Sequence, residues 1–201
     1  MLQHIRPAVV LLVLFSALTG LVYPLAVTGV AQLVLPRQAN GTLIERDGIV
    51  AGSALVGQYF KSARYFHGRP SATTDTDPND PSKTIDAPYN AANSSGSNLG
   101  PTSQKLVDRV KAGVEAWRAM AGAGRVPADA VTTSASGLDP DVSPETALAQ
   151  VASVAKARGL DPARVRALVE ASVEKPAFGL IGEPRVNVLQ LNLALDQLRS
   201  P

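Results

Sequence analysis

A run of thirty residues without a charged side chain, from Pro7 to Pro36, constrains the fold more than any other feature of the sequence. About 20 apolar residues in helical conformation are enough to cross the hydrocarbon core of a bilayer. Within that core, a single spanning segment must pair all of its own backbone N–H and C=O groups, and only a helix does so. The sequence therefore predicts a membrane helix over residues 7–36, followed by a water-soluble domain over residues 37–201.

The charges beside this run predict its orientation. His4 and Arg6 precede it, together with the terminal amine, and no acidic residue accompanies them. Because basic residues are enriched on the cytoplasmic side of membrane helices, we expect the N-terminus inside and the soluble domain outside. A cleaved signal peptide, cut near Val30-Ala31, is the alternative. The apolar core of a signal peptide is about 7–15 residues long, so the length of the run favours a retained anchor.

Five small or polar residues recur at intervals of four within the run: Ser16, Gly20, Pro24, Thr28 and Gln32. This spacing places them along one face of a helix, and small or hydroxylic residues let membrane helices approach closely. Pro24 has no N–H, so the carbonyl of Gly20 loses its partner and a kink is predicted. We expect this row to contact partner helices. The alternative is an anchor that tolerates Pro and Gly, which are common in membrane helices.

Composition narrows the chemistry open to the soluble domain. The whole chain has 19 Lys and Arg against 17 Asp and Glu, which predicts no nucleic-acid-binding patch. It has no cysteine, which excludes thiol catalysis and thiolate metal sites. Of its two histidines, only His67 lies in the soluble domain. A serine triad or a multi-histidine zinc site would depend on that residue alone, so a structural role for His67 is favoured.

Local patterns predict a mixed α/β (α+β) domain. Asp47-Gly48 between short apolar runs predicts a hairpin over residues 43–50. Residues 53–60 are predicted as strand or turn, residues 73–103 as a long loop rich in Asp, Pro, Asn, Ser and Gly, and residues 131–136 as a short strand.

Four helices are predicted from apolar periodicity and start signals. The first covers residues 102–121 and ends at Gly122. Two others begin at Ser-Pro and Asp-Pro pairs, which are a capping residue followed by proline in the first turn. The predicted helices after the first run from Ser143 to Gly159, from Asp161 to Pro176, and from Asn187 onward.

One acidic stretch is similar to the start of a calcium loop. Counted from Asp75, oxygen-bearing side chains fall at the first, third, fifth and twelfth positions, which are Asp75, Asp77, Asn79 and Asp86. The sixth position is Asp80, where the sharp turn of such a loop requires Gly, and no helices flank the stretch. A solvated acidic turn is therefore the favoured interpretation.

Other catalytic patterns are weak or missing. Ser153 and Lys156 match a Ser-x-x-Lys nucleophile pattern, but they fall within a predicted amphipathic helix and no Lys-Thr-Gly occurs. No nucleophile elbow and no phosphate-binding loop is present in the sequence. The neutral polar stretch 93–100 is either a flexible linker or a docking loop. We predict no catalytic residue, no cofactor-binding residue and no metal site.

The membrane segment and several later stretches together resemble a known family. Thr19–Leu25 has the sequence TGLVYPL, and Tyr65–Ala72 has the sequence YFHGRPSA. Both are similar to KdpC, the C subunit of the bacterial Kdp potassium-transporting P-type ATPase. Further similar stretches follow in one order along nearly the whole chain: Thr28–Gln32, Gly52–Gln58, Tyr89–Asn90, Gly96–Pro101, Ser134–Pro140, Val154–Leu160 and Val186–Asp196. Residues 75–86 match no motif of the family.

The resemblance implies an accessory subunit and not an enzyme. In that complex a channel-like subunit binds potassium, a P-type pump subunit hydrolyses ATP, and a small single-helix subunit completes the assembly. The C subunit is described as a catalytic chaperone that raises the ATP affinity of the pump subunit. The resemblance thus implies ATP, Mg²⁺ and K⁺ for the complex and no cofactor for the chain itself. It also implies a bacterial inner membrane location, with the soluble domain in the periplasm.

The sequence limits how such an effect on ATP could arise. It has no Asp-Lys-Thr-Gly phosphorylation motif, and its soluble domain is expected on the side away from cytoplasmic ATP. Any influence on nucleotide binding would have to be allosteric, passed through membrane partners. Two alternatives remain. One is a free anchored or secreted envelope binding protein, such as a calcium-binding module. The other is an anchored serine hydrolase, which the missing motifs disfavour.

Overall fold

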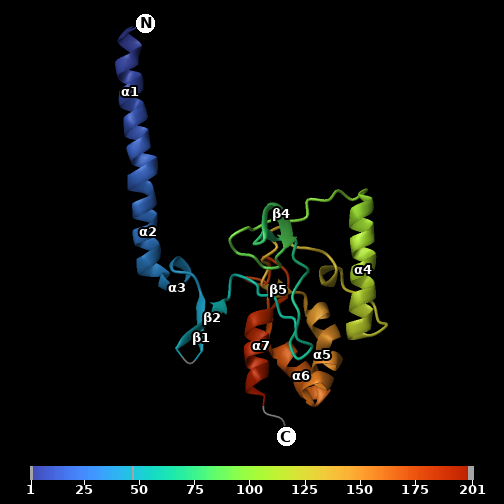
Figure 1. Ribbon diagram of the computed structural model, residues 1–201. Coiled ribbons are helices and arrows are strands. Elements are labelled where there is room, and N and C mark those ends of the chain that lie inside the picture. The colour runs from blue at the N-terminus through green and yellow to red at the C-terminus, as the bar shows by residue number, and fades with distance from the viewer. Residues whose placement is uncertain (1, 47, 199–201) are drawn as a thin grey trace. The chain divides into compact units, whose positions relative to one another are not determined.

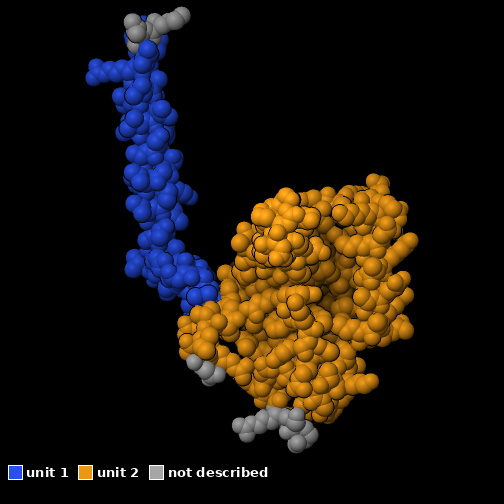
Figure 2. Space-filling model, viewed as in Figure 1, with its two compact units in different colours: residues 1–43 blue, residues 44–201 orange. Residues whose placement is uncertain are grey.

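The computed structural model describes residues 2–46 and 48–198. The chain divides into two compact units, residues 1–43 and residues 44–201, which Figure 2 shows in different colours. The first unit is helical, and the second combines helices with short antiparallel strands. This confirms the predicted α+β domain with one long apolar helix at its N-terminal side.

One long helical segment makes up most of the N-terminal unit (Figure 1). It consists of α1 (Leu2–Ala17), a π-helical turn η1 (Leu18–Val22) and α2 (Tyr23–Val34). Between Gln3 and Val34 it is long and apolar enough to cross a membrane, and its apolar window has no residue buried within the chain. The predicted division of the chain at residue 37 stays a prediction.

The helix changes its hydrogen-bonding pattern immediately before Pro24. The backbone N–H of Tyr23 donates to the carbonyl of Leu18, five residues earlier, whereas an α-helical bond spans four. Proline has no N–H to donate, and a π turn beside it is one way for a helix to accommodate the missing bond. The sequence predicted a kink at this point, and the structure has a π-helical turn.

A break at Leu35 separates α2 from the short helix α3 (Pro36–Ala39). The backbone of Leu35 is not helical, with φ −134° and ψ 56°. The side-chain amides of Gln32 and Asn40 exchange two hydrogen bonds across the break, at 3.0 and 2.9 Å. These bonds hold the two helices together where the backbone pattern is interrupted.

Among the described residues after residue 42, the strands form three small sheets. The predicted hairpin is confirmed as β1 (Leu43–Arg46) paired with β2 (Ile49–Ser53), although Asp47 of its turn lies outside the described residues. A second sheet pairs β3 (Thr74–Asp77) with β4 (Asp80–Asp86). In the third, β7 (Arg185–Asn187) lies between β5 (Asp141–Val142) and β6 (Val173–Glu174).

The three C-terminal helices form the main core with the third sheet: α5 (Pro144–Arg158), α6 (Pro162–Ala171) and α7 (Val188–Gln197). Each is capped as predicted. The side chain of Ser143 accepts from the N–H of Thr146, that of Asp161 from Ala163, and that of Asn187 from Gln190. The helices enclose fully buried apolar side chains, namely Phe66, Val165, Val169, Leu191 and Leu195.

Helix α4 (Gln104–Ala121) lies beside α5 (Figure 1). A separate apolar cluster of side chains packs between them. Trp117 of α4 is buried there against Ala130, which belongs to the 3₁₀ turn η2 (Ala128–Ala130), and against Val131. The helix ends at Gly122, whose φ of 97° suits glycine. The predicted helix over residues 102–121 is therefore confirmed.

Three predictions of local structure are wrong. Residues 73–103 are not all loop, because β3 and β4 form a hairpin there. Both strands are largely solvent-exposed, so they lack the alternation of apolar residues that reveals a strand. Residues 131–136 form no strand, since their hydroxyl groups bond to nearby backbone: Ser134 Oγ accepts from Gly137 N–H, and Ser136 Oγ from Leu138 N–H. The third predicted helix ends at Ala171, and the following Val173 pairs with β7.

Candidate functional site

An irregular segment, residues 65–72, runs past α5 and α7 and is held by two buried amide side chains. Asn192 of α7 accepts from the N–H of Phe66 at 2.8 Å and donates to its carbonyl at 3.0 Å. Gln150 of α5 does the same for His67, at 2.8 and 3.1 Å. Both amides are 1% exposed. They replace the neighbouring strand that would otherwise satisfy this buried backbone.

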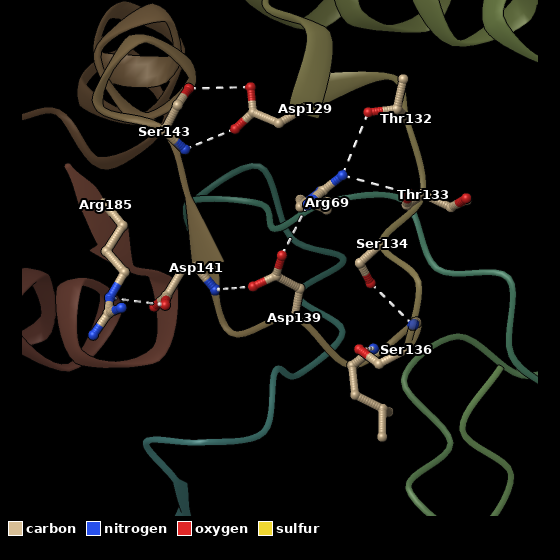
Figure 3. Close-up of polar contacts among 12 residues, drawn as sticks. Arg69, Asp129, Thr132, Thr133, Ser134, Ser136, Asp139, Asp141, Ser143 and Arg185 are labelled. Carbon is tan, nitrogen blue, oxygen red and sulfur yellow. Dashed lines mark hydrogen bonds and ion pairs between the residues drawn. The ribbon is translucent and has the colours of Figure 1, made fainter. Parts of the chain in front are cut away.

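This segment positions Arg69 in a network of polar groups (Figure 3). One guanidinium nitrogen donates to the carboxylate of Asp139 at 2.9 Å, and another donates to the carbonyl of Thr133 at 3.3 Å. The hydroxyl of Thr132 lies 3.5 Å from the same second nitrogen. The Arg69 side chain therefore ties residues 65–72 to the loop between η2 and β5.

Ion pairs and one backbone hydrogen bond connect Arg69 to the third sheet. Asp139 also accepts from the N–H of Asp141 at 3.1 Å, and Asp141 pairs with Arg185 at 3.2 Å. Arg185 pairs in turn with Glu174 at 2.9 Å. Burial raises the pKa of Asp141 above its ordinary value, although the Arg185 guanidinium works against the shift. The network links the ends of β5, β6 and β7 to the loop that carries Arg69.

Asp129 joins the same region to the start of α5. Its carboxylate accepts from the N–H and the hydroxyl of Ser143, at 2.7 and 3.0 Å, and from the hydroxyl of Thr146 at 2.6 Å. A carboxylate at a helix N-terminus also meets the positive end of the helix dipole. Asp129 therefore fixes the loop after α4 against the first turn of α5.

Tyr89 closes the other side of the segment. Its hydroxyl donates to the carbonyl of Arg69 at 2.8 Å, and its N–H donates to Ser71 Oγ at 3.0 Å. Burial, with a further effect of the Asp139 carboxylate, raises the pKa of Tyr89 to about 12. A Cβ atom added to Gly57 would collide with the Tyr89 ring, and one added to Gly68 would collide with the Tyr89 hydroxyl. Both positions need glycine because the aromatic side chain lies directly against the backbone.

A cavity of about 410 Å³ lies between this segment and α4. Its wall is largely aromatic and apolar, with Tyr59, Phe60, Tyr89, Trp117 and Met120 among the lining residues. Of the residues that the structure describes, Arg69 contributes a buried Nε that has no hydrogen-bond partner. The cavity is suited to an apolar group.

The predicted chemistry candidates are each engaged in separate local contacts or exposed. The ring of His67 contacts the carbonyl of Ser62 at 3.2 Å. Ser153 donates its hydroxyl to the carbonyl of Gln150 within its own helix, and Lys156 is exposed. Across residues 2–46 and 48–198, no three His, Cys, Asp or Glu side chains are grouped as a metal site would require.

The calcium-loop pattern lies on the β3–β4 hairpin. Asp75 accepts from the N–H of Thr76, and Asp77 accepts from the N–H of Asn79. Asp80, at the position that a calcium loop needs for glycine, pairs with Lys83 at 2.9 Å. Hydrogen bonds from Ser82 and Lys83 lower the pKa of the Asp80 carboxyl below its usual value. The carboxylates are used to shape the turns of a hairpin and are not gathered around one point.

The five residues of the membrane row are all exposed in the chain: Ser16, Gly20, Pro24, Thr28 and Gln32. A Cβ atom at Gly20 would meet nothing within 4 Å. Gln32 has a use that the sequence did not predict, since its amide is paired with Asn40. Contact between this row and partner helices stays a prediction.

Sequence reasoning missed residues that organise the second compact unit: Arg69, Asp129, Asp139, Gln150 and Asn192. A signal for two of them existed. Gln150 and Asn192 interrupt otherwise apolar helix faces, and a polar residue at a core position must find a partner. The pairing of Arg69 with Asp139 spans 70 residues of sequence and had no such local signal.

Known proteins match this chain along almost its whole length. A family model described as K⁺-transporting ATPase, c chain (KdpC), matches residues 5–197. A potassium-transporting ATPase KdpC subunit from Methylobacterium nodulans is 64% identical over 198 residues. Those from Rhodopseudomonas palustris and Bradyrhizobium diazoefficiens are 62% and 61% identical over 196 and 197 residues. Each alignment covers 98% of both chains. The chain therefore belongs to the KdpC family of potassium-transporting ATPase subunits, as its resemblance predicted.

Proposed function

We propose that this chain is a non-catalytic accessory subunit of an ATP-driven potassium uptake pump in a bacterial inner membrane. Its partners are the channel-like subunit, the P-type pump subunit and a small single-helix subunit. The observation that carries the proposal is the apolar helix Gln3–Val34, which buries nothing within its own chain, in a member of the KdpC family. Such a helix has its whole surface available for lipid and for neighbouring membrane helices.

The orientation proposed is N-terminus in the cytoplasm and soluble domain in the periplasm. His4 and Arg6 support it, because they precede the helix without any acidic residue. A reporter enzyme that is active only outside the cytoplasm, fused after residue 201, tests this directly. We expect activity from the fusion and an intact N-terminus. A soluble product that begins near Gln32 would mean that the segment is a cleaved signal.

The second part of the proposal is that the chain raises the ATP affinity of the pump subunit. The complex would use ATP, Mg²⁺ and K⁺, while this chain supplies no phosphate-binding loop or phosphorylated Asp-Lys-Thr-Gly motif. The effect would be a coupling free energy passed between subunits, and such energies are typically about 1–3 kcal/mol. That corresponds to roughly 5–150-fold in ATP affinity.

The membrane row gives the sharpest test. Replacing Gly20 with Leu adds bulk where two helices are expected to meet, and overpacking costs about 1–3 kcal/mol. We expect roughly tenfold to hundredfold weaker retention of the large subunits on a tagged chain in mild detergent. The ATP concentration for half-maximal hydrolysis should rise in parallel. Leu11→Phe, five residues before Ser16 and so on the opposite side of α1 from the row, is the matched control and should assemble normally.

Two results would contradict the proposal at different levels. If Gly20→Leu assembles as well as the unaltered chain while Leu11→Phe does not, the contact face has been assigned wrongly. If omission of the whole chain leaves the ATP dependence of the pump unchanged, the effect on nucleotide affinity is absent even though the chain belongs to the complex.

A further inference from the structure

An exposed apolar tip lies on the connection between β6 and β7, at residues 177–181. Phe178 is 92% exposed, Leu180 is 88% exposed and Ile181 is 68% exposed. Phe178 and Leu180 are the two most exposed large apolar side chains among the described residues, the membrane helix included. Single exposed apolar residues are normal on a protein surface, but three within four positions mark a surface that is covered in use.

The tip has a preformed shape. Ala177 and Ile181 exchange backbone hydrogen bonds at 2.9 and 3.0 Å, and the N–H of Gly179 donates to the carbonyl of Pro176 at 3.0 Å. Phe178 adopts a φ of 54°, which is uncommon for a residue other than glycine and carries an energetic cost. The turn therefore presents its side chains in one arrangement before any partner is met. Such preorganisation lowers the entropy lost on binding.

Charged groups surround the root of the tip. Glu174 and Arg185 form an ion pair at 2.9 Å at the ends of the two strands. A polar hollow of about 490 Å³ lies beside them, and Glu183, Pro184 and Arg185 belong to its lining. The hollow has five carboxylates against two arginines, and both arginines are already paired, Arg69 with Asp139 and Arg185 with Asp141. The carboxylates of the hollow are Asp129, Asp139, Asp141, Glu145 and Glu183.

These features favour a protein over a lipid surface as the occupant. Insertion of the tip into a bilayer would bring Glu174 and Glu183 against the headgroups together with Lys175 and Arg185, so the root has no excess of basic residues to bind anionic lipid. Fluid lipid also requires no fixed arrangement of side chains, so the strained backbone at Phe178 would have no purpose there. An apolar centre with a charged rim is the usual composition of a protein–protein interface.

We propose that the 177–181 tip is an anchor that inserts into an apolar socket on a membrane-embedded subunit of the same pump. A Lys or Arg of that subunit, beside the socket, enters the acidic hollow and fixes the direction of docking. The inference rests on the proposed role as an accessory subunit and names the surface by which the soluble domain engages. Apolar anchors of this kind dominate the energetics of an interface, while the surrounding charges contribute direction and specificity.

Site-specific photo-crosslinking in the assembled complex tests the contact. Phe178 is replaced by p-benzoylphenylalanine, which keeps an aromatic ring at the tip, and the complex is irradiated in native membranes. We expect a covalent product that contains one of the two large subunits, identified by mass spectrometry. The same replacement at Glu170, which is exposed on α6, is the control and should give no such product. Equal crosslinking from both positions, or none from position 178, would overturn the proposal.

A double substitution measures the strength of the anchor. Phe178→Ala with Leu180→Ser should weaken retention of the large subunits at least about tenfold, since two anchoring side chains are lost. The thermal unfolding midpoint of the full chain in detergent should stay within a few degrees of the unaltered chain, because the replaced side chains are exposed. Unchanged retention would contradict the proposal.

A third measurement decides between protein and lipid. The chain has no native cysteine, so Leu180→Cys accepts a single polarity-sensitive dye. The full chain is reconstituted alone into vesicles of phosphatidylcholine and phosphatidylglycerol. No blue shift is expected, and a blue shift there would replace the socket with a lipid surface. If Gly20→Leu disrupts assembly while the tip variants do not, the subunit role stands and this inference fails. If the unaltered chain retains no large subunit, the subunit role itself fails.

Discussion

The C-terminal helices and the loops around Arg69 belong to the same unit but are stabilised in different ways. Helices α5, α6 and α7 enclose apolar side chains that are fully buried, such as Val169 and Leu191. Around Arg69, side chains bond mainly to backbone, and most of the segment has no regular structure. Apolar burial tolerates some change of shape, whereas a hydrogen-bonded loop depends on the individual donor and acceptor. The two regions should therefore respond differently to substitution.

The largest expected effect is in the helical core. Leu191→Ala removes a side chain with no exposed surface, and such substitutions cost about 2–5 kcal/mol through lost burial and the cavity left behind. The measurement is urea unfolding of the full chain in detergent, followed by the fluorescence of Trp117, the chain's single tryptophan. Leu180→Ala, at the exposed tip, is the control. A loss below 1 kcal/mol would mean that the core repacks freely.

The next effect is expected at the junction of the two regions. Asn192→Ala leaves both the N–H and the carbonyl of Phe66 without their partner, and an unsatisfied buried polar group costs about 1–3 kcal/mol. The unfolding midpoint should fall, and the amide of Phe66 should exchange its hydrogen faster. Asn93→Ala, which removes an exposed amide that bonds Thr74, is the matched control. Unchanged exchange at Phe66 would show that water replaces the amide.

A close approach of backbone to an aromatic ring gives the third prediction. Gly57→Ala places a methyl group against Tyr89 and 2.5 Å from the carbonyl oxygen of Asp139, so one of them must move. We expect about 1–3 kcal/mol of destabilisation, as for other overpacked sites. Gly100→Ala is the control, because its added Cβ would meet nothing within 4 Å. Equal stability of the two variants would show that the loops around Arg69 shift at little cost to make room for the added methyl group.

The smallest effect is on pH dependence, and the two regions should differ in its sign. Burial raises the pKa of Asp141, so the folded state binds this proton more tightly than the unfolded state, and its contribution to stability falls as pH rises above about 3.8. Burial raises the pKa of Asp196 on α7, but the hydrogen bond and the positive charge of Arg158 lower it, as do hydrogen bonds from Tyr65 and Arg46. The net result is a lowered pKa. The contribution of Asp196 to stability is therefore fully present above its ordinary pKa of about 3.8 and is lost as pH falls through the lowered pKa.

Unfolding free energies from pH 3 to pH 6 test these opposite signs. Asp141→Asn should lessen the decline of stability with rising pH, and Asp196→Asn should lessen the decline with falling pH. If both variants change the pH profile in the same direction, one of the two environments has been assigned wrongly.

The same contrast explains how far the sequence predicts this fold. Helices α4 to α7 were predicted because their caps and apolar spacing are local signals, as at Ser143 and Asn187. The loops around Arg69 were not, because their partners are 18 to 126 residues away in sequence and leave no local periodic pattern. Strands β5 and β6 have two residues each, too few for any periodic pattern. The candidate site depends on these long-range contacts, so only its glycine-rich and aromatic motifs were visible beforehand.

The pair of hydrogen bonds between Gln32 and Asn40 has a mechanical consequence. Leu35 interrupts the helix, so the chain beyond it would otherwise swivel independently of α2. Because the two amides are joined by hydrogen bonds, Asn40 moves together with Gln32 when α2 rotates about its own axis. The position of Asn40 around the helix axis is thus tied to that of Gln32.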